Sequence, residues 1–366
     1  MNHVIGQKLC WYSASDTHLG HDTGPSSDNI TTSYTKNVWA INEMNILPGN
    51  DTWPASLGGG AVLVPAGVTI SGDLIDNGIG PGTEVNGCNQ WENFTALYGL
   101  DGTDGLIKYK VYEGRGNHDG ANSSHANPTD CTGHPTTWVI GRNKQRLQNP
   151  SFNVQNVSEP TGLHYSWTWN ITDTCRVHFV HMNLFPGHGC GSPDNPNGEG
   201  KAPGFPCSDA DLSWAENSLD FLESDLAMYA TDPSTLVVTI QHYGFDGFSN
   251  TWYNEDQRIE LFNTLNKYNT LAVLVGHTHE ALLYSIKNGT TQGEWGTTEP
   301  GYINVVNAPA TQKEDGQHNA LPSEFMVLEA GFNSEEDAKA GTGVFRVAQR
   351  VGHGWGTVLG SVPFQC

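Results

Sequence analysis

The sequence has 366 residues and a formal net charge of −22, with 17 lysine and arginine residues against 39 aspartate and glutamate residues. A chain of this length can bury a large core, and no apolar run approaches the roughly 20 residues of a membrane span. The acidic balance argues against nucleic acid as a partner, because proteins bind nucleic acid mainly through cationic contacts to phosphates.

Patterns typical of strands and helices alternate over the first two-thirds of the chain, and the last third is mostly strand-like. Strands are predicted at Val68–Ser71, Tyr109–Glu113, His164–Trp169, Val177–Asn183, Leu236–Gln241, Leu271–Val275, Tyr302–Val306, Phe325–Glu329, Gly343–Gln349 and Gly356–Val362. Helices are predicted at Ser33–Asn45, Thr137–Leu147, Asp209–Tyr229 and Glu255–Lys267. This order predicts an α/β fold with layered sheets at its centre.

The clearest predicted helix is Asp209–Tyr229, in which apolar residues recur on one face and Ser208 can act as the N-cap. The preceding stretch, 185–207, predicts a long inserted loop, which in a compact domain is usually functional or tethered by a disulfide. No linker composition is present, so we expect one domain over residues 1–366, with a β-rich C-terminal part at about 301–366.

Two segments near the N-terminus carry acidic residues after short apolar runs. Asp16 and His18 could converge on one ion as the chain turns, although alone such a pair more often forms a helix cap or an Asx turn. The strand Val68–Ser71 runs into Gly72, which permits a tight turn, and then Asp73, whose carboxylate can bridge two cations. Ligands gather at the C-terminal ends of strands in such sheets. An ordinary turn without a ligand is also compatible with this sequence.

The segment after Tyr109–Glu113 is the most specific. Asn117 offers a neutral carbonyl ligand and His118 offers a proton donor. The adjacent Asp119 could fix the tautomer of His118 and raise its basicity. The surrounding glycines let the loop approach a small ligand closely, although a plain turn remains open as an alternative.

Two later predicted strands run into histidines. Leu236–Gln241 leads to His242, and Leu271–Val275 leads through a glycine to His277 and His279. A lone histidine at the end of a strand is usually a structural residue. Two histidines separated by one residue after such a strand more often bind a metal.

Taken together, the four strand-led segments place ligand-type side chains at strand ends, and parallel strands would bring those ends to one rim. Mixed nitrogen and oxygen ligands suit zinc, iron or manganese better than calcium. Roughly seven ligands are too many for one tetrahedral zinc, but they fit two ions that share a bridging carboxylate. Two such ions are a standard device for in-line displacement at phosphorus, and they would offset the acidic surface for a small phosphate ester.

The order D-x-H, G-D-x-x-D, G-N-H-D, H, G-H-x-H resembles the calcineurin-like metallophosphoesterase superfamily, over roughly three-quarters of the chain. The resemblance implies a four-layer αββα sandwich of two mixed β-sheets flanked by helices, with a dinuclear metal site at the C-terminal ends of the strands. It implies hydrolysis of a phosphate monoester or diester by in-line attack of metal-bound hydroxide on phosphorus. The two divalent or trivalent metal ions would be Zn, Fe or Mn.

The resemblance also assigns roles to single residues. Asp16, His18 and His279 would hold the first metal, and Asn117, His242 and His277 would hold the second. Asp73 would bridge the two ions, and His118 would act as the general acid or stabilise the phosphoryl oxygens, oriented by Asp119. Purple acid phosphatases are similar but carry a tyrosine ligand three residues after the bridging aspartate. Asp76 stands at that position here, which argues against the iron–tyrosinate subclass.

Sequons and cysteines indicate an oxidising compartment. Sequons of the form N-x-S/T lie at Asn29, Asn50, Asn93, Asn122, Asn156, Asn170 and Asn288. Cys190 and Cys207 bracket a Gly/Pro-rich stretch and form the best candidate disulfide, ahead of Cys88 with Cys131. We expect a secreted glycoprotein, extracellular or lumenal as in a lysosome or vacuole, although the first ten residues lack the apolar region of a signal peptide.

Substrate contacts are less clear. Arg115, Arg142, Lys144 and Arg146 could clamp a phosphate, but a solvated helix face with ion pairs is the simpler interpretation. The aromatic residues after His242 could line a pocket or pack in the core; they are Tyr243, Phe245, Phe248, Trp252 and Tyr253. Two further histidines, which could reach the site but are not assigned to it, are His181 and His188.

We therefore expect a phosphoesterase that acts on a small-molecule or lipid-headgroup phosphate ester. The alternative is a structural or assembly glycoprotein that keeps the fold with little or no activity. A free cysteine, or Cys366 at the extreme C-terminus, would support self-assembly, whereas the complete ligand set speaks for an enzyme. A nuclease would need a basic groove, which the sequence does not provide.

Overall fold

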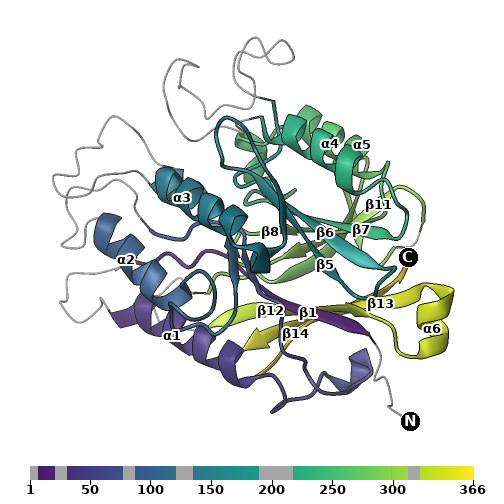
Figure 1. Cartoon of the computed structure of the whole chain (residues 1–366), viewed down its shortest axis with the longest axis horizontal. Coiled ribbons are helices and arrows are strands. Elements are labelled where there is room, and N and C mark those ends of the chain that lie inside the picture. Colours follow the sequence, from purple (N-terminus) through teal and green to yellow (C-terminus); the bar gives the residue numbers. More distant parts are fainter. Residues whose placement is uncertain are drawn as a thin grey trace.

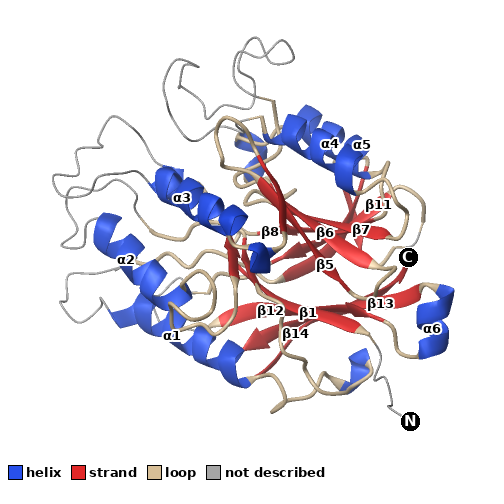
Figure 2. Cartoon of the chain, in the orientation of Figure 1, coloured by secondary structure: helices blue, strands red, loops and turns tan. Residues whose placement is uncertain are grey.

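The computed structural model describes residues 7–20, 31–76, 87–120, 135–188, 217–297, 299–311 and 322–366. In this part of the chain two β-sheets pack against each other and helices cover their outer faces (Figures 1 and 2). The predicted α/β class with two mixed sheets between helices is confirmed.

The first sheet has six strands and carries both ends of the described chain. Its order is β14 (Gly354–Gln365), β13 (Thr342–Val351), β12 (Glu324–Gly331), β1 (Lys8–Ala14), β2 (Val68–Ile70) and β3 (Val111–Glu113). β1, β2 and β3 are parallel, whereas β12 and β13 pair antiparallel with their neighbours. The three parallel strands therefore end at one edge of the sheet.

The second sheet has eight strands and a parallel centre. Its order is β10 (Thr291–Glu294), β9 (Leu282–Lys287), β11 (Tyr302–Asn307), β8 (Thr270–Val275), β7 (Thr235–Ile240), β6 (Arg176–His181), β5 (Tyr165–Asn170) and β4 (Val154–Val157). β6, β7, β8 and β11 are parallel, and antiparallel hairpins flank them.

Helices cover both outer faces. α1 (Thr31–Ile46), α2 (Gly87–Tyr98) and α3 (Pro135–Gln148) pack on the first sheet. α4 (Ser218–Tyr229) and α5 (Glu255–Leu265) pack on the second sheet, and the short α6 (Glu335–Ala340) precedes β13. No helix among the described residues is both long enough and apolar enough to cross a membrane.

The alternation of side chains along β1 shows how the layers are held together. Trp11 points between the sheets, where it stacks on Phe345 at 5.7 Å and meets the edge of Phe179 at 5.3 Å. The next residue, Tyr12, points the other way and donates a hydrogen bond to the Met44 carbonyl of α1. Successive residues of a strand face opposite sides, so one short strand anchors two cores.

Each predicted strand overlaps an observed one, but several elements were not predicted. These are β1, β4, β9, β10, α2 and α6. α2 contains glycine, asparagine and threonine, which are weak helix formers, and packing of Phe94 and Leu97 under it compensates.

The predicted helix Asp209–Tyr229 requires correction. α4 begins at Ser218, because Asn217 has a left-handed φ of 59° that a continuous α-helix does not allow. The expected cap Ser208 lies outside the described residues, as does most of the expected loop at 185–207.

A disulfide among the described residues joins the two sheets and pairs the C-terminal cysteine within its own chain. Cys175 precedes β6 in the second sheet, and Cys366 follows β14 in the first; their sulfurs are bonded. Among the cysteines that the structure describes, Cys10 is a free thiol and is buried in β1. The predicted pair Cys190 and Cys207 lies outside the described residues.

Candidate metal centre

The seven candidate ligands all follow the C-terminal ends of parallel strands. Asp16 and His18 follow β1, Asp73 follows β2, and Asn117 follows β3. From the second sheet, His242 follows β7 and the pair His277 and His279 follows β8. The parallel parts of the two sheets thus deliver their ends to one rim.

The backbone is unusual where these side chains emerge. Nine residues other than glycine have positive φ in the described part of the chain, and five of them are candidate ligands: Asp16, His18, Asp73, His277 and His279. Such conformations are uncommon for residues with a side chain and gather at functional sites.

Two glycines allow the loops after β2 and β3 to touch. A Cβ atom on Gly116 would lie 2.2 Å from Asp73 Oδ1 and 2.5 Å from the Asp73 nitrogen. A Cβ atom on Gly72 would lie 2.6 Å from the Gly116 nitrogen. Both distances are far below a van der Waals contact, so no larger residue fits at either position.

The first cluster consists of Asp16, His18 and His279. His18 Nε2 lies 3.2 Å from His279 Nε2, and Asp16 Oδ1 lies 3.2 Å from His279 Nε2 and 3.6 Å from His18 Nε2. Asp16 also accepts a hydrogen bond from the His277 backbone at 3.0 Å, which ties the loop after β1 to the loop after β8.

The second cluster consists of Asp73, His242 and His277, and Asn117 adjoins it. His242 Nε2 lies 3.2 Å from Asp73 Oδ2 and 3.0 Å from Asn117 Oδ1. Asp73 Oδ2 is also 3.6 Å from His18 Nε2 of the first cluster. Asp73 therefore stands between the two clusters. In each cluster the atoms that could hold a metal lie within 4.8 Å of one another.

The donor atoms suit metal ions. His277 Nε2 is buried and has no hydrogen-bond partner among the described residues. Burial and neighbouring His242 lower the pKa of His277 to about 4, which leaves its lone pair available. Burial opposes ionisation of Asp16, but His18 and His279 outweigh it and hold its pKa well below the usual value. Neutral imidazoles and ionised carboxylates are the ligand forms that zinc, iron and manganese take.

Asp119 has a different place from the one expected. Its carboxylate accepts hydrogen bonds from the backbone nitrogens of Leu74 at 2.9 Å, Ile75 at 3.1 Å and Gly116 at 2.7 Å. It thereby fastens the loop after β2 to the loop after β3. Burial and the charge of Asp73 raise the pKa of Asp119 to about 7. The expected orientation of His118 by Asp119 is therefore wrong.

Asp76 contacts His118 instead. Nδ1 of His118 lies 2.5 Å from the Asp76 carbonyl, and the Asp76 carboxylate is 3.4 Å from His18 Nδ1. The His118 backbone donates to Asp73 Oδ1 at 2.8 Å, while its side chain remains 40% exposed. The sequence contained a signal for this contact, since Asp76 is the second aspartate of the G-D-x-x-D motif.

A supporting chain of hydrogen bonds comes from helices and was not predicted. Asn37 of α1 donates to the Thr17 carbonyl at 2.8 Å, and Tyr98 of α2 donates to Asn37 Oδ1 at 2.7 Å. These contacts fix the backbone between Asp16 and His18 to helices α1 and α2. No local pattern marks them, because they join residues 20 and 61 positions apart.

Two of the three basic residues of α3 are unavailable for a phosphate clamp. Arg142 and Arg146 are buried and both pair with Glu113 at the end of β3. The opposing charges satisfy each other below the surface, which corrects that possibility in favour of ion pairs. The two unassigned histidines are also engaged elsewhere: His181 with the Ile70 carbonyl, and His188 with Asp220.

Some of the aromatic residues after His242 pack in the core, and one lies open at the candidate site. Tyr243, Phe245 and Tyr253 are buried in the core under α4 and α5. Phe248 is 62% exposed and stacks on the His277 ring at 5.1 Å with an interplanar angle of 12°. One aromatic side chain therefore lies open beside the second cluster.

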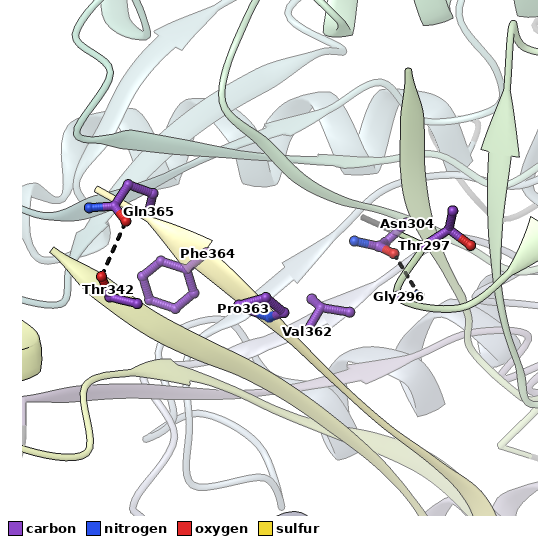
Figure 3. A pocket seen from close by; sticks show the side chains of 8 residues that line it. All are labelled: Gly296, Thr297, Asn304, Thr342, Val362, Pro363, Phe364 and Gln365. Carbon is purple, nitrogen blue, oxygen red and sulfur yellow. Dashed lines mark hydrogen bonds between the residues drawn. The ribbon is translucent and has the colours of Figure 1, made fainter. Parts of the chain in front are cut away.

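A separate cavity of about 370 Å³ lies between the end of β14 and the turn before β11 (Figure 3). Gln365 and Thr342 are hydrogen-bonded on one side of it, and Asn304 bonds the Gly296 backbone on the other. The residues that line it in the described part of the chain include no acidic, basic or histidine side chain.

The sequence and the fold were compared with known proteins. The model of the calcineurin-like phosphoesterase family matches residues 54–281, and a comparison with curated proteins finds no match. A dimetal phosphatase from Danio rerio has a TM-score of 0.50 and 12% identity, and the match covers 98% of both chains. GAP50, the anchor in the inner membrane complex of Plasmodium, has a TM-score of 0.51 and 10% identity, covering 98% of this chain and 90% of that one. At these identities the two structures show a shared fold.

Proposed function

Because the chain belongs to the calcineurin-like phosphoesterase family, we propose that it hydrolyses a small phosphate ester at two metal ions held on the common rim of its sheets. The observation that carries the proposal is the position of Asp73 between two histidine-containing clusters. An acidic residue shared by two N/O ligand sets is what a pair of bridged ions requires.

The two clusters would each hold one ion. Asp16, His18 and His279 would form one site, and His242 and His277 the other; the remaining ligands are Asn117 and the bridging Asp73. The ions would supply Lewis acidity at the phosphoryl oxygens and a water of lowered pKa for in-line attack.

His118 would handle the proton of the leaving group. Its Nδ1 donates to the Asp76 carbonyl, so the tautomer is fixed and Nε2 is the atom left to face the substrate. Protonated at Nε2, the imidazole can hydrogen-bond a phosphoryl oxygen or pass its proton to the departing alkoxide. The partly exposed side chain can reach a ligand without rearrangement of the buried loops.

Within the family, we place the chain outside the purple acid phosphatases. Asp76 stands where that group has a tyrosine ligand, and its carbonyl and carboxylate face His118 and His18.

We propose an extracellular or lumenal location. The Cys175–Cys366 disulfide and the sequons support it. Pairing of Cys366 with Cys175 in the same chain removes one argument for the alternative, an assembly glycoprotein linked between chains through Cys366.

The test combines metal content with turnover. Purified protein is loaded with zinc, manganese or iron, and hydrolysis of p-nitrophenyl phosphate and bis-p-nitrophenyl phosphate is measured for wild type, His118→Ala and Asp73→Asn. We expect two ions per chain in wild type. We expect His118→Ala to keep both ions and lose roughly 100-fold or more in kcat, and Asp73→Asn to lose metal.

An exposed residue remote from the rim, Met228 on α4, provides the control variant Met228→Ala, which should behave as wild type. Absence of bound metal after every loading condition would contradict the proposal. So would unchanged turnover in His118→Ala.

A further inference from the structure

Phe248 is presented by a turn that holds it in place. The Asp246 carboxylate accepts hydrogen bonds from the backbone nitrogens of Phe248 at 2.9 Å and Ser249 at 2.8 Å, and from Ser249 Oγ at 2.6 Å. Arg258 of α5 donates to the Asp246 carbonyl at 2.9 Å. Both the side chain and the backbone carbonyl of Asp246 are therefore hydrogen-bonded, and Phe248 is exposed on an ordered turn.

Among the described residues, two aromatic rings pack against Phe248 and fix the plane of its ring. It stacks on His277 and meets the edge of Trp252 at 5.2 Å with an interplanar angle of 79°. Burial of an apolar ring would be favourable by about 1.5–3 kcal/mol, yet this ring remains 62% exposed. An exposed phenyl ring against a candidate metal ligand offers an apolar contact beside the second cluster.

A small cavity adjoins the same loops. Its volume is about 170 Å³, and its lining includes Asp246 of the Phe248 turn, Thr278 between the two histidines after β8, and Leu282 at the start of β9. Leu282 is 44% exposed. A cavity of about 150 Å³ is large enough for benzene, so one ring or a short alkyl chain fits.

The charge of the cavity limits what can enter. The described residues of its lining include no lysine or arginine, and one of them is the acidic Asp246. A second phosphate or a carboxylate on the ligand would be repelled at this short range.

From these features we infer that Phe248 and Leu282 select the organic group of the substrate, an uncharged aryl or short alkyl group that lies against Phe248 and enters the cavity beside Thr278. This inference rests on the proposed function, because it places the ester's phosphorus at the two clusters. It makes the preferred substrate a phosphate ester of a compact apolar alcohol or phenol.

The test uses ligands that bind without reacting. Metal-loaded wild type, Phe248→Ala, Leu282→Ala and the control Met228→Ala are titrated with phenylphosphonate, methylphosphonate and inorganic phosphate, and bound metal is measured in each. We expect wild type to bind phenylphosphonate more tightly than methylphosphonate. Phe248→Ala and Leu282→Ala should each weaken phenylphosphonate by about 5- to 10-fold, with methylphosphonate and phosphate changed less than about twofold and metal content unchanged.

Two results would overturn the inference and leave the proposed function standing. One is a wild type that binds phosphate but does not prefer the phenyl ligand. The other is variants that weaken both phosphonates equally or neither, which would assign Phe248 to the support of His277 or to no role. Failure of metal-loaded wild type to bind phosphate or either phosphonate would instead overturn the proposed function and the inference with it.

Discussion

Three aspartates close together in the rim have different surroundings, and these decide what each carboxylate does. Asp73 lies among histidine nitrogens, Asp119 lies among backbone N–H groups, and Asp76 faces the rings of His18 and His118. Histidines favour the ionised carboxylate, whereas burial beside Asp73 raises the pKa of Asp119. The residue type is constant and the neighbours set the role.

Asp119 provides a test of this distinction. Asp119→Ala removes the acceptor for three buried backbone N–H groups, and we expect it to lower the free energy of unfolding by about 3 kcal/mol. Metal content should fall as well, because the loops after β2 and β3 separate. Urea unfolding and metal analysis measure both effects, with Asp119→Asn as the milder variant that keeps one acceptor. If Asp119→Ala instead keeps normal stability and metal content but shifts the pH profile of kcat, this account is contradicted. Asp119 would then act on His118, as the sequence predicted.

At the scale of elements, buried polar side chains join the layers. His181 of β6 lies in the second sheet, and its Nε2 donates to the Ile70 carbonyl of β2 in the first sheet at 3.0 Å. Its Nδ1 accepts from the Asn183 backbone at 3.1 Å. Both nitrogens are occupied in the neutral form, and burial lowers the pKa of His181 to about 4.

This histidine should make stability depend on pH. Between the ordinary pKa of 6.5 and the folded value of about 4, the unfolded chain binds the proton that the folded chain excludes, so stability is lost as pH falls through this window. The loss for this one group approaches about 3 kcal/mol near pH 4.

His181→Gln cannot take up the proton. It should be less stable than wild type at pH 7, and the difference should shrink toward pH 4.5. Urea unfolding at several pH values measures the slope, and comparison of the two proteins cancels the effect of the other histidines. Parallel stability curves for the two proteins would contradict this account.

At the scale of the molecule, the two sheets are joined at two places. One is the rim of candidate ligands after the parallel strands. The other is the disulfide between Cys175, before β6, and Cys366, after β14, which closes a sequence separation of 191 residues. A cross-link over such a separation removes much freedom from the unfolded chain.

We expect Cys366→Ser to lower the free energy of unfolding by about 2–5 kcal/mol. The midpoint of thermal unfolding should fall, and wild type treated with reductant should fall to the same value. Cys10→Ser changes a thiol outside the disulfide and serves as the control for reductant sensitivity. A covalent dimer of wild type on non-reducing gels, or unchanged stability in Cys366→Ser, would contradict the intrachain pairing.

The sequence by itself determined the sheet class and the ligand types at the strand ends. These follow from local features: apolar runs of strand length, a glycine or a turn after each, and then side chains of the types that can bind metals. Asp73 and His242 could be recognised in this way without knowledge of what they touch. The sequence predicted a common rim for them on the condition that the strands are parallel, because parallel strands end on the same side.

The tertiary structure alone decided which groups meet across long separations. Asp119 bonds amides more than 40 positions away, and Asn37 reaches from a helix to the loop after β1. The sequence could not predict three further features for the same reason: the pairing of Cys366, the burial of Arg142 and the exposure of Phe248. A side chain's type sets what it can bind, whereas packing of distant elements sets what lies within reach.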